Sequence, residues 1–128
     1  MARSAPTGRL VAGIDLATAH ARVAVAAGDG RVVARASAPI APPRRPAPGT
    51  SEQAARSWWP AVATALREAL AGVAGEVVAV AVSATSGTVV LADRSGEPVG
   101  PAVLYDDSRA PAPARWDLLL PQPSAVPT

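Results

Sequence analysis

The 128-residue sequence predicts an α/β fold, one domain at most or part of one, with its elements in the order βββαββ. Short apolar or alternating runs at 10–15 and 21–27 flank a tight turn, and a second turn follows at 28–30. Apolar residues at helical spacing come next, within 50–73, and a run of β-branched residues and alanine lies at 77–83. These three observations favour a strand meander, a crossover helix and further strands.

The first three strands are expected to form an antiparallel meander. Residues 10–15 are mostly apolar, which suits a buried strand, and 21–27 places Val23 and Val25 on one face. Glycine and aspartate at 28–30 tolerate positive φ and therefore indicate a hairpin, after which residues 31–37 return as a third strand.

A proline-rich connector and one helix follow the meander. Five prolines within 38–49 predict an extended spacer, with a ligand for an SH3-type partner as the alternative. Pro60 fits only the first helical turn, which makes Ser57 the predicted N-cap. The apolar stripe consists of Val62, Leu66, Leu70 and Val73, and Gly72 or Gly75 is expected to stop the helix. The adjacent Trp58 and Trp59 are either a hydrophobic anchor at the helix start or a ligand platform.

The second half of the chain predicts two more strands. Residues 77–83 are expected to be buried on both faces, hence central and parallel to the first strand. A polar loop at 84–87 leads to a predicted strand at 88–92 and a turn at 93–96. The domain boundaries expected from these patterns are a loose terminus at 1–9, a partial domain at 10–110 and a proline-rich irregular tail at 111–128.

Composition excludes several classes of protein. The sequence has no cysteine and one histidine, which excludes a disulfide framework and a cysteine-based zinc site. The net charge is only +2, the arginines are scattered and aromatic residues make up 3%, so nucleic-acid binding is not expected. No apolar run reaches the ~18 residues that a membrane span needs. Without a signal-like N-terminal segment, the predicted location is the cytoplasm.

Two side chains near the first turn point to chemistry. Asp15 lies at the end of the first predicted strand and Thr18 lies within the turn. A carboxylate and a hydroxyl in these positions can face the phosphates and metal of a nucleotide, although Asp15 also fits a simple strand-end cap. The order of elements resembles the opening of an RNase H-like, or actin-like ATPase, domain, and topology alone leaves function open.

Four segments in sequence order resemble the N-terminal portion of the FGGY carbohydrate kinases, in particular their xylulokinase-like and ribulokinase-like branches. They are the glycine–isoleucine–aspartate turn at 13–18, the Ser-Glu-Gln and Trp-Trp pair within 51–59, the Thr-Ser-Gly-Thr stretch within 82–93, and the Tyr-Asp-Asp-Ser-Arg-Ala stretch within 101–110. The resemblance covers about residues 10–110 and implies phosphoryl transfer from ATP to a hydroxyl of a pentulose-like sugar.

The resemblance also implies roles for individual residues. Asp15 would orient Mg²⁺ or its water shell, and the turn of Ala17, Thr18 and Ala19 would face the phosphates of ATP. Thr85 and Ser86 would contact the sugar. Asp107 and Arg109 would shape the sugar pocket or brace its loop. Ordinary turn chemistry at Ser86 and a surface charge cluster at 106–109 are the alternatives.

Two departures from the family pattern bear on function. Ala17 stands where the family has glycine, which allows positive φ and close approach of the backbone to phosphate, and Ala19 replaces the usual hydroxyl. The family's catalytic aspartate and second domain lie beyond the length of this chain. We therefore expect a fragment or truncated product that is inactive alone. A non-catalytic remnant or interaction module, or a proline-mediated adaptor, is the alternative.

Overall fold

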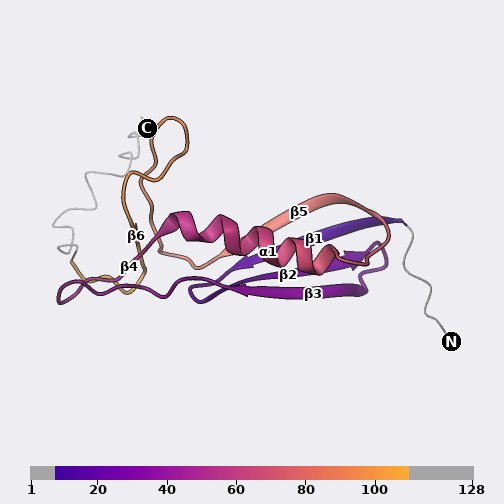
Figure 1. Cartoon of the computed structure of the whole chain (residues 1–128), viewed down its shortest axis with the longest axis horizontal. Helices are drawn as coiled ribbons and strands as arrows, with labels where there is room; N and C mark the ends of the chain where they lie inside the picture. Colours follow the sequence, from indigo (N-terminus) through magenta and orange to yellow (C-terminus); the bar gives the residue numbers. More distant parts are fainter. Residues whose placement is uncertain (1–7, 110–128) are drawn as a thin grey trace, which may run out of the picture.

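A computed structural model describes residues 8–109, which form a four-stranded sheet with one helix packed on one face (Figure 1). The predicted tail at 111–128 and most of the predicted loose terminus at 1–9 lie outside the described residues. The sheet consists of β1 (Arg9–Leu16), β2 (His20–Ala27), β3 (Val32–Pro39) and β5 (Glu76–Ala84). The helix is α1 (Trp58–Leu70), preceded by the short 3₁₀ helix η1 (Ala55–Ser57). The short strands β4 (Glu52–Gln53) and β6 (Ala102–Val103) pair with each other at one end of the molecule.

The predicted antiparallel meander is confirmed. β1 pairs with β2 from Leu10↔Ala27 to Leu16↔Ala21, and β2 pairs with β3. In the second hairpin turn Gly30 has φ +82°, and its N–H donates to the carbonyl of Ala27 at 2.9 Å. The glycine at this position therefore supplies the left-handed conformation that the turn requires.

β5 lies parallel to β1, as predicted, but it forms an edge of the described sheet, whose order is β3-β2-β1-β5. The expectation that 77–83 is central and buried on both faces is wrong for the described residues. Val80 and Val82 are 57% and 67% exposed. The physical reason is the placement of α1, which packs on β2 and β3, touches β1 only marginally and leaves β5 without a covering helix.

The predicted helix start is confirmed, since Ser57 occupies the N-cap position and Trp58, Trp59 and Pro60 form the first turn. The Ser57 hydroxyl donates back to the carbonyl of Ala54 at 2.7 Å and makes no capping bond to the helix. At the other end Gly72 has φ +74°, which ends the helix. The fully buried face of α1 consists of Ala61, Val62, Ala65 and Ala69, with Leu66 and Leu70 partly buried beside it.

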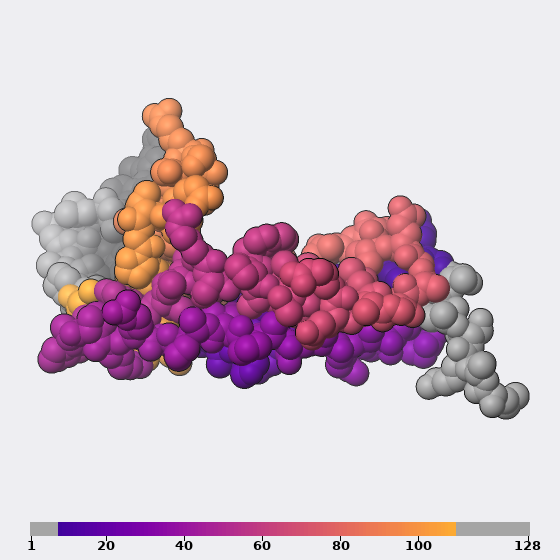
Figure 2. Space-filling view, in the orientation of Figure 1, coloured from indigo at the N-terminus to yellow at the C-terminus, as the bar shows by residue number. Residues whose placement is uncertain are grey.

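The predicted strand at 88–92 is not a strand. Only two isolated bridges occur there, Val89↔Val103 and Ala92↔Pro98, and Leu91 is 70% exposed. The Asp93 carboxylate accepts the N–H groups of Ser95 and Glu97, at 2.8 and 3.0 Å, and this turn folds the segment back on itself. Figure 2 shows the resulting projection in orange, standing away from the sheet beside the start of α1.

Candidate functional site

The turn between β1 and β2, residues 17–19, is closed by backbone hydrogen bonds. The N–H of Ala17 donates to the carbonyl of His20 at 3.0 Å, and the carbonyl of Ala19 accepts the N–H of Ile40 at 2.9 Å. Every non-glycine residue in the described part of the chain has negative φ. The turn therefore does not use the left-handed conformation for which glycine is needed, and Ala17 fits it without backbone strain.

Thr18 and Thr85 line the same small cavity, of about 90 Å³. The carboxyl ends of β1 and β5 meet here, and the N–H of Thr85 donates to the carbonyl of Leu16 at 3.3 Å. The lining residues come from the ends of β1 and β5, the segments that follow them, β4, the start of α1 and the residue after β6: Leu16, Ala17, Thr18, Gln53, Trp58, Ala84, Thr85, Thr88 and Leu104. This volume accommodates a few waters or one end of a small polyol, not a whole sugar.

Thr88 adds an unsatisfied polar atom to this cavity. Its hydroxyl oxygen is buried and has no hydrogen-bond partner among the residues that the structure describes. A buried hydroxyl without a partner carries a desolvation cost. A water or ligand hydroxyl in the cavity would remove that cost, so Thr88 joins Thr18 and Thr85 as a candidate contact.

Asp15 lies apart from this cavity. Alternation along β1 places it on the sheet face opposite α1, where it lines a shallow hollow of about 680 Å³. Its Oδ2 accepts a hydrogen bond from Nη1 of Arg22 at 2.9 Å, and the two side chains are 47% and 59% exposed. Asp15 and Thr18, which the sequence predicts to face phosphate, therefore line two different pockets. The Asp15 carboxylate is already paired with the guanidinium of Arg22.

Ser86 is exposed and does not line the small cavity. It precedes Gly87, which has φ +74° and turns the loop against Tyr105. The structure thus places Thr85, and not its neighbour Ser86, at the wall of the small cavity.

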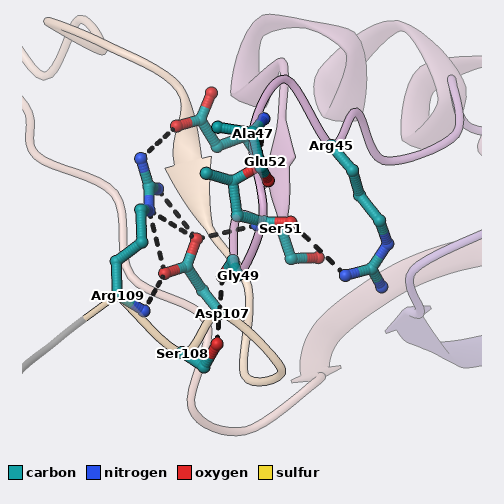
Figure 3. Close-up of polar contacts among 9 residues, drawn as sticks. Arg45, Ala47, Gly49, Ser51, Glu52, Asp107, Ser108 and Arg109 are labelled. Atoms are coloured by element: carbon teal, nitrogen blue, oxygen red, sulfur yellow. Dashed lines mark hydrogen bonds and ion pairs between the residues drawn. The ribbon is translucent and has the colours of Figure 1, made fainter.

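Asp107 and Arg109 brace a loop and do not line the cavity (Figure 3). The Asp107 side chain is only 4% exposed and accepts the N–H of Ser51 at 2.8 Å. Arg109 binds the same carboxylate and also pairs with Glu52 at 2.8 Å. The hydrogen bonds from Arg109, followed by the bond from the Ser51 amide, hold the pKa of Asp107 well below its usual range.

Backbone bonds reinforce this connection. The N–H of Leu104 donates to the carbonyl of Ser51 at 2.9 Å, and the N–H of Ser108 donates to the carbonyl of Gly49 at 2.8 Å. Residues 102–109 are therefore fixed against residues 49–53, which carry β4. Of the two readings that the resemblance implied for Asp107 and Arg109, the geometry supports the loop brace.

The two tryptophans have different surroundings. Trp58 is partly buried and packs against the core, whereas Trp59 is 69% exposed. Only Trp58 acts as a hydrophobic anchor. Its indole Nε1–H also donates to Oε1 of Gln53 at 2.9 Å, at the edge of the small cavity.

Gln53 and Thr88 are candidate site residues to which the sequence alone assigns no role. Gln53 belongs to the Ser51–Gln53 segment already noticed for its resemblance, and its spacing of five residues from Trp58 is the signal that could have paired them. Thr88 is the last residue of the Thr-Ser-Gly-Thr stretch noticed for the same resemblance, but its burial depends on the fold of the 84–104 loop, which no local pattern indicates.

No group of three or more histidine, cysteine, aspartate or glutamate side chains is gathered into a metal-binding cluster within residues 8–109. In the same part of the chain no helix is long and apolar enough to cross a membrane. Asp15 is thus a single carboxylate rather than part of a dedicated metal site.

Comparison with known proteins finds one matching family and two similar kinases. The model of the FGGY family of carbohydrate kinases, N-terminal domain, matches residues 10–116. Xylulose kinase of Streptomyces coelicolor is 38% identical over 114 residues, which cover 88% of this chain and 23% of that protein. Xylulose kinase of Streptomyces rubiginosus is 36% identical over 109 residues, covering 84% of this chain and 22% of that protein.

Solved structures agree in fold. The crystal structure of xylulose kinase from Rhodospirillum rubrum aligns with a TM-score of 0.72 and 27% identity, over 79% of this chain and 21% of that one. Plasmodium falciparum glycerol kinase with ADP aligns with a TM-score of 0.70 over 81% of this chain and 22% of that one, and its 17% identity shows the fold alone. This chain spans less than a quarter of the length of the curated relatives that it matches. Its sequence and its partial α/β sheet of the actin-like ATPase type show that the chain belongs to the FGGY family of carbohydrate kinases, as part of their N-terminal domain.

Proposed function

We propose that this chain supplies the phosphate-facing turn and the sugar-facing loop of a kinase that transfers the γ-phosphate of ATP to a hydroxyl of a pentulose-like sugar. One observation carries the proposal: Thr18, in the turn after β1, and Thr85, in the loop after β5, line one cavity. In open α/β sheets, ligands bind outside the carboxyl ends of parallel strands, and β1 and β5 are such a pair.

The residues divide between the two substrates. The backbone of Ala17, Thr18 and Ala19 would face the phosphates, and the hydroxyls of Thr85 and Thr88 would contact one end of the sugar. Ser86 has an accessory role at most, since it is exposed. Asp107 and Arg109 would act indirectly, by holding the loop that carries Leu104 at the cavity wall.

Mg²⁺ fits this chain only in an indirect role. A single carboxylate, Asp15, is suited to a cation whose other ligands are waters and the phosphates of ATP. Asp15 lines a different opening from Thr18, so it would reach the metal only through the metal's water shell, and the ion pair with Arg22 would keep the carboxylate in place. When bound to ATP, Mg²⁺ would neutralise charge on the transferring phosphoryl group.

Catalytic turnover requires more than these residues. The residues that line the small cavity include no aspartate, glutamate or histidine, so no described group there can accept the proton of the attacking hydroxyl. We therefore propose that the base and a second domain come from further kinase sequence, and that this 128-residue chain is inactive without them.

A chimera tests the proposal. This chain would replace the matching segment of Streptomyces coelicolor xylulose kinase, and ATP- and D-xylulose-dependent ADP release would be measured. We expect activity in the chimera, its loss with Thr85→Val, little change with Ser86→Ala, and no turnover by the 128-residue chain alone. A folded but inactive chimera, or robust turnover by the chain alone, would contradict the proposal.

A non-catalytic interaction module on the same fold is the second candidate. It is favoured by the edge strand β5, whose exposed valines are available to another polypeptide. Calorimetry separates the two candidates. Pentulose binding that Thr85→Val abolishes supports the kinase fragment, whereas protein binding without any sugar or nucleotide affinity supports the module.

A further inference from the structure

The Gln53 side chain joins three segments that are distant in the sequence. It is only 3% exposed, and its Nε2 donates to the carbonyl of Thr18 at 2.8 Å and to the carbonyl of Ala41 at 2.7 Å. Its Oε1 accepts the indole N–H of Trp58 at 2.9 Å. One carboxamide thus links the β1–β2 turn, the proline-rich connector and the first turn of α1.

The chemistry of these partners fixes the orientation of the amide. An indole N–H can only donate, and backbone carbonyls can only accept. Trp58 must therefore face the oxygen of Gln53, while Thr18 and Ala41 must face its nitrogen. A flipped amide would set two carbonyl oxygens against a third oxygen and leave the indole N–H without an acceptor, so the carboxamide is held in one orientation.

The turn has few other restraints. Its remaining hydrogen bonds within the described residues join backbone groups, from Ala17 to His20 and from Ile40 to Ala19. Gln53 makes the only side-chain hydrogen bond to residues 17–19 in that part of the chain. Thr18, Gln53 and Thr85 line the same small cavity, so the hydrogen bond from Gln53 to Thr18 acts at the wall that faces Thr85.

We propose that Gln53 is a positioning residue that holds the 17–19 turn in the conformation in which it meets the phosphate-transfer site. The part of this inference that concerns phosphate rests on the function proposed above, whereas the effect on the turn does not. Gln53 need not touch either substrate, since it acts through the backbone of Thr18.

The variant Gln53→Glu is the sharpest test, because it keeps size and shape while removing the donor. An ionised carboxylate would repel the carbonyls of Thr18 and Ala41. A residue that merely fills space would tolerate this change better than a residue that positions the turn.

Amide hydrogen exchange in the full chain provides the first readout. The N–H groups of Ala17 and Ile40 report on the turn, and the N–H of Gly30, bonded to Ala27 at the other end of the meander, is the internal reference. We expect exchange about tenfold faster or more at Ala17 and Ile40 in Gln53→Glu, with Gly30 unchanged. The control Ser57→Ala removes a nearby hydrogen bond to Ala54 and should leave the exchange rates of Ala17 and Ile40 unchanged. Unchanged turn amides, or equal acceleration at Gly30, would overturn the inference.

A second variant covers the case in which Gln53→Glu does not fold. Trp58→Phe keeps an aromatic ring at this position but removes the donor that orients the carboxamide, together with part of the packing of the indole. We expect smaller acceleration at Ala17 and Ile40, with Gly30 again unchanged. No selective change in Trp58→Phe would then count against the positioning role.

Kinetics of the xylulose kinase chimera give a second readout, the separate effects on kcat and on KM, which a purely structural role of Gln53 would not produce. We expect Gln53→Glu to lower kcat about tenfold or more, with KM for the sugar unchanged. A parallel rise in KM for the sugar, or an unchanged kcat, would overturn the role at the phosphate-transfer site. If the unsubstituted chimera is inactive, the proposed function fails, and hydrogen exchange still decides whether Gln53 holds the turn.

Discussion

Asp107 and Arg109 form a two-point ion pair inside a loop. Nε of Arg109 lies 3.0 Å from Oδ1 of Asp107, and Nη2 lies 2.8 Å from its Oδ2. The same carboxylate accepts the amide N–H of Ser51, and the same guanidinium pairs with Glu52. Two residues of the 102–109 loop are thereby tied to Ser51 and Glu52, the two residues that directly precede Gln53.

Replacing this carboxylate tests the brace. Asp107→Asn keeps one side-chain oxygen for the Ser51 amide but removes the negative charge whose two oxygens Arg109 binds. We expect the melting temperature of the chain to fall by a few degrees, measured by circular dichroism. Asp29→Asn is the control, since Asp29 is exposed in the β2–β3 hairpin, and a comparable fall there would contradict a special role for Asp107.

Acid should weaken the same brace. The pKa of Asp107 is lower in the folded chain than the ordinary value of about 3.9. A depressed folded pKa contributes stability that is fully present above the unfolded pKa and is lost as pH falls through the folded pKa. We expect urea stability to decline from about pH 4 downward and this decline to be shallower in Asp107→Asn. An equally steep decline in that variant would assign it to other carboxylates.

The alanine at position 17 is expected to suit its turn. Because φ is negative there, Ala17→Gly relieves no strain and instead gives the unfolded chain more freedom. We expect a loss of about 0.4–1 kcal/mol in the free energy of unfolding, measured with urea. A gain in stability from this substitution would show that the methyl group strains the turn.

Gly75, between α1 and β5, should be the least replaceable glycine. It has φ +140°, and a Cβ atom built on it would lie 2.6 Å from the carbonyl oxygen of Gly8 and 2.9 Å from Cδ1 of Leu10. We expect Gly75→Ala to cost about 1–3 kcal/mol or more, because both the backbone conformation and the contact are unfavourable. Gly100→Ala, where a Cβ meets nothing within 4 Å, should be nearly neutral in the same urea titration.

The uncovered strand β5 should control solubility. Val82 is 67% exposed on an edge strand, which is an arrangement prone to pairing with other chains. We expect Val82→Lys to reduce self-association in sedimentation velocity without lowering the melting temperature. Val25→Lys is the contrasting variant, since Val25 is fully buried and a lysine there should unfold the chain.

Local patterns predicted most of the described fold. Strands, turns and helix starts that depend only on residues close in the sequence were predicted correctly. Examples are the strand at 21–27, the hairpin turn around Asp29 and the helix start at Pro60. The run at 88–92 was misread because its valines and leucine have the composition of a strand, while the Asp93 turn pulls the chain out of the sheet. Burial of 77–83 was overestimated because it depends on which strands the helix covers, which no local pattern specifies.

The candidate site was less predictable than the fold. Thr85 and Thr18 follow from their places at strand ends, but the separation of Asp15 from them depends on the alternation of side chains across the sheet. The role of Gln53 depends on three partners that are 5, 12 and 35 residues away. Only the folded chain brings those groups together.

The position of α1 over β2 and β3 has a consequence for the order of folding. The strands that α1 covers, and α1 itself, all lie between Arg9 and Leu70 in the sequence. The contacts among them therefore join residues that are not far apart along the chain. β5 must instead return across the helix to reach β1 in parallel. Since short-range contacts form faster than such crossovers, we expect the meander and α1 to assemble on the ribosome before β5 has emerged. The exposed edge strand would then be added to a body that is already folded.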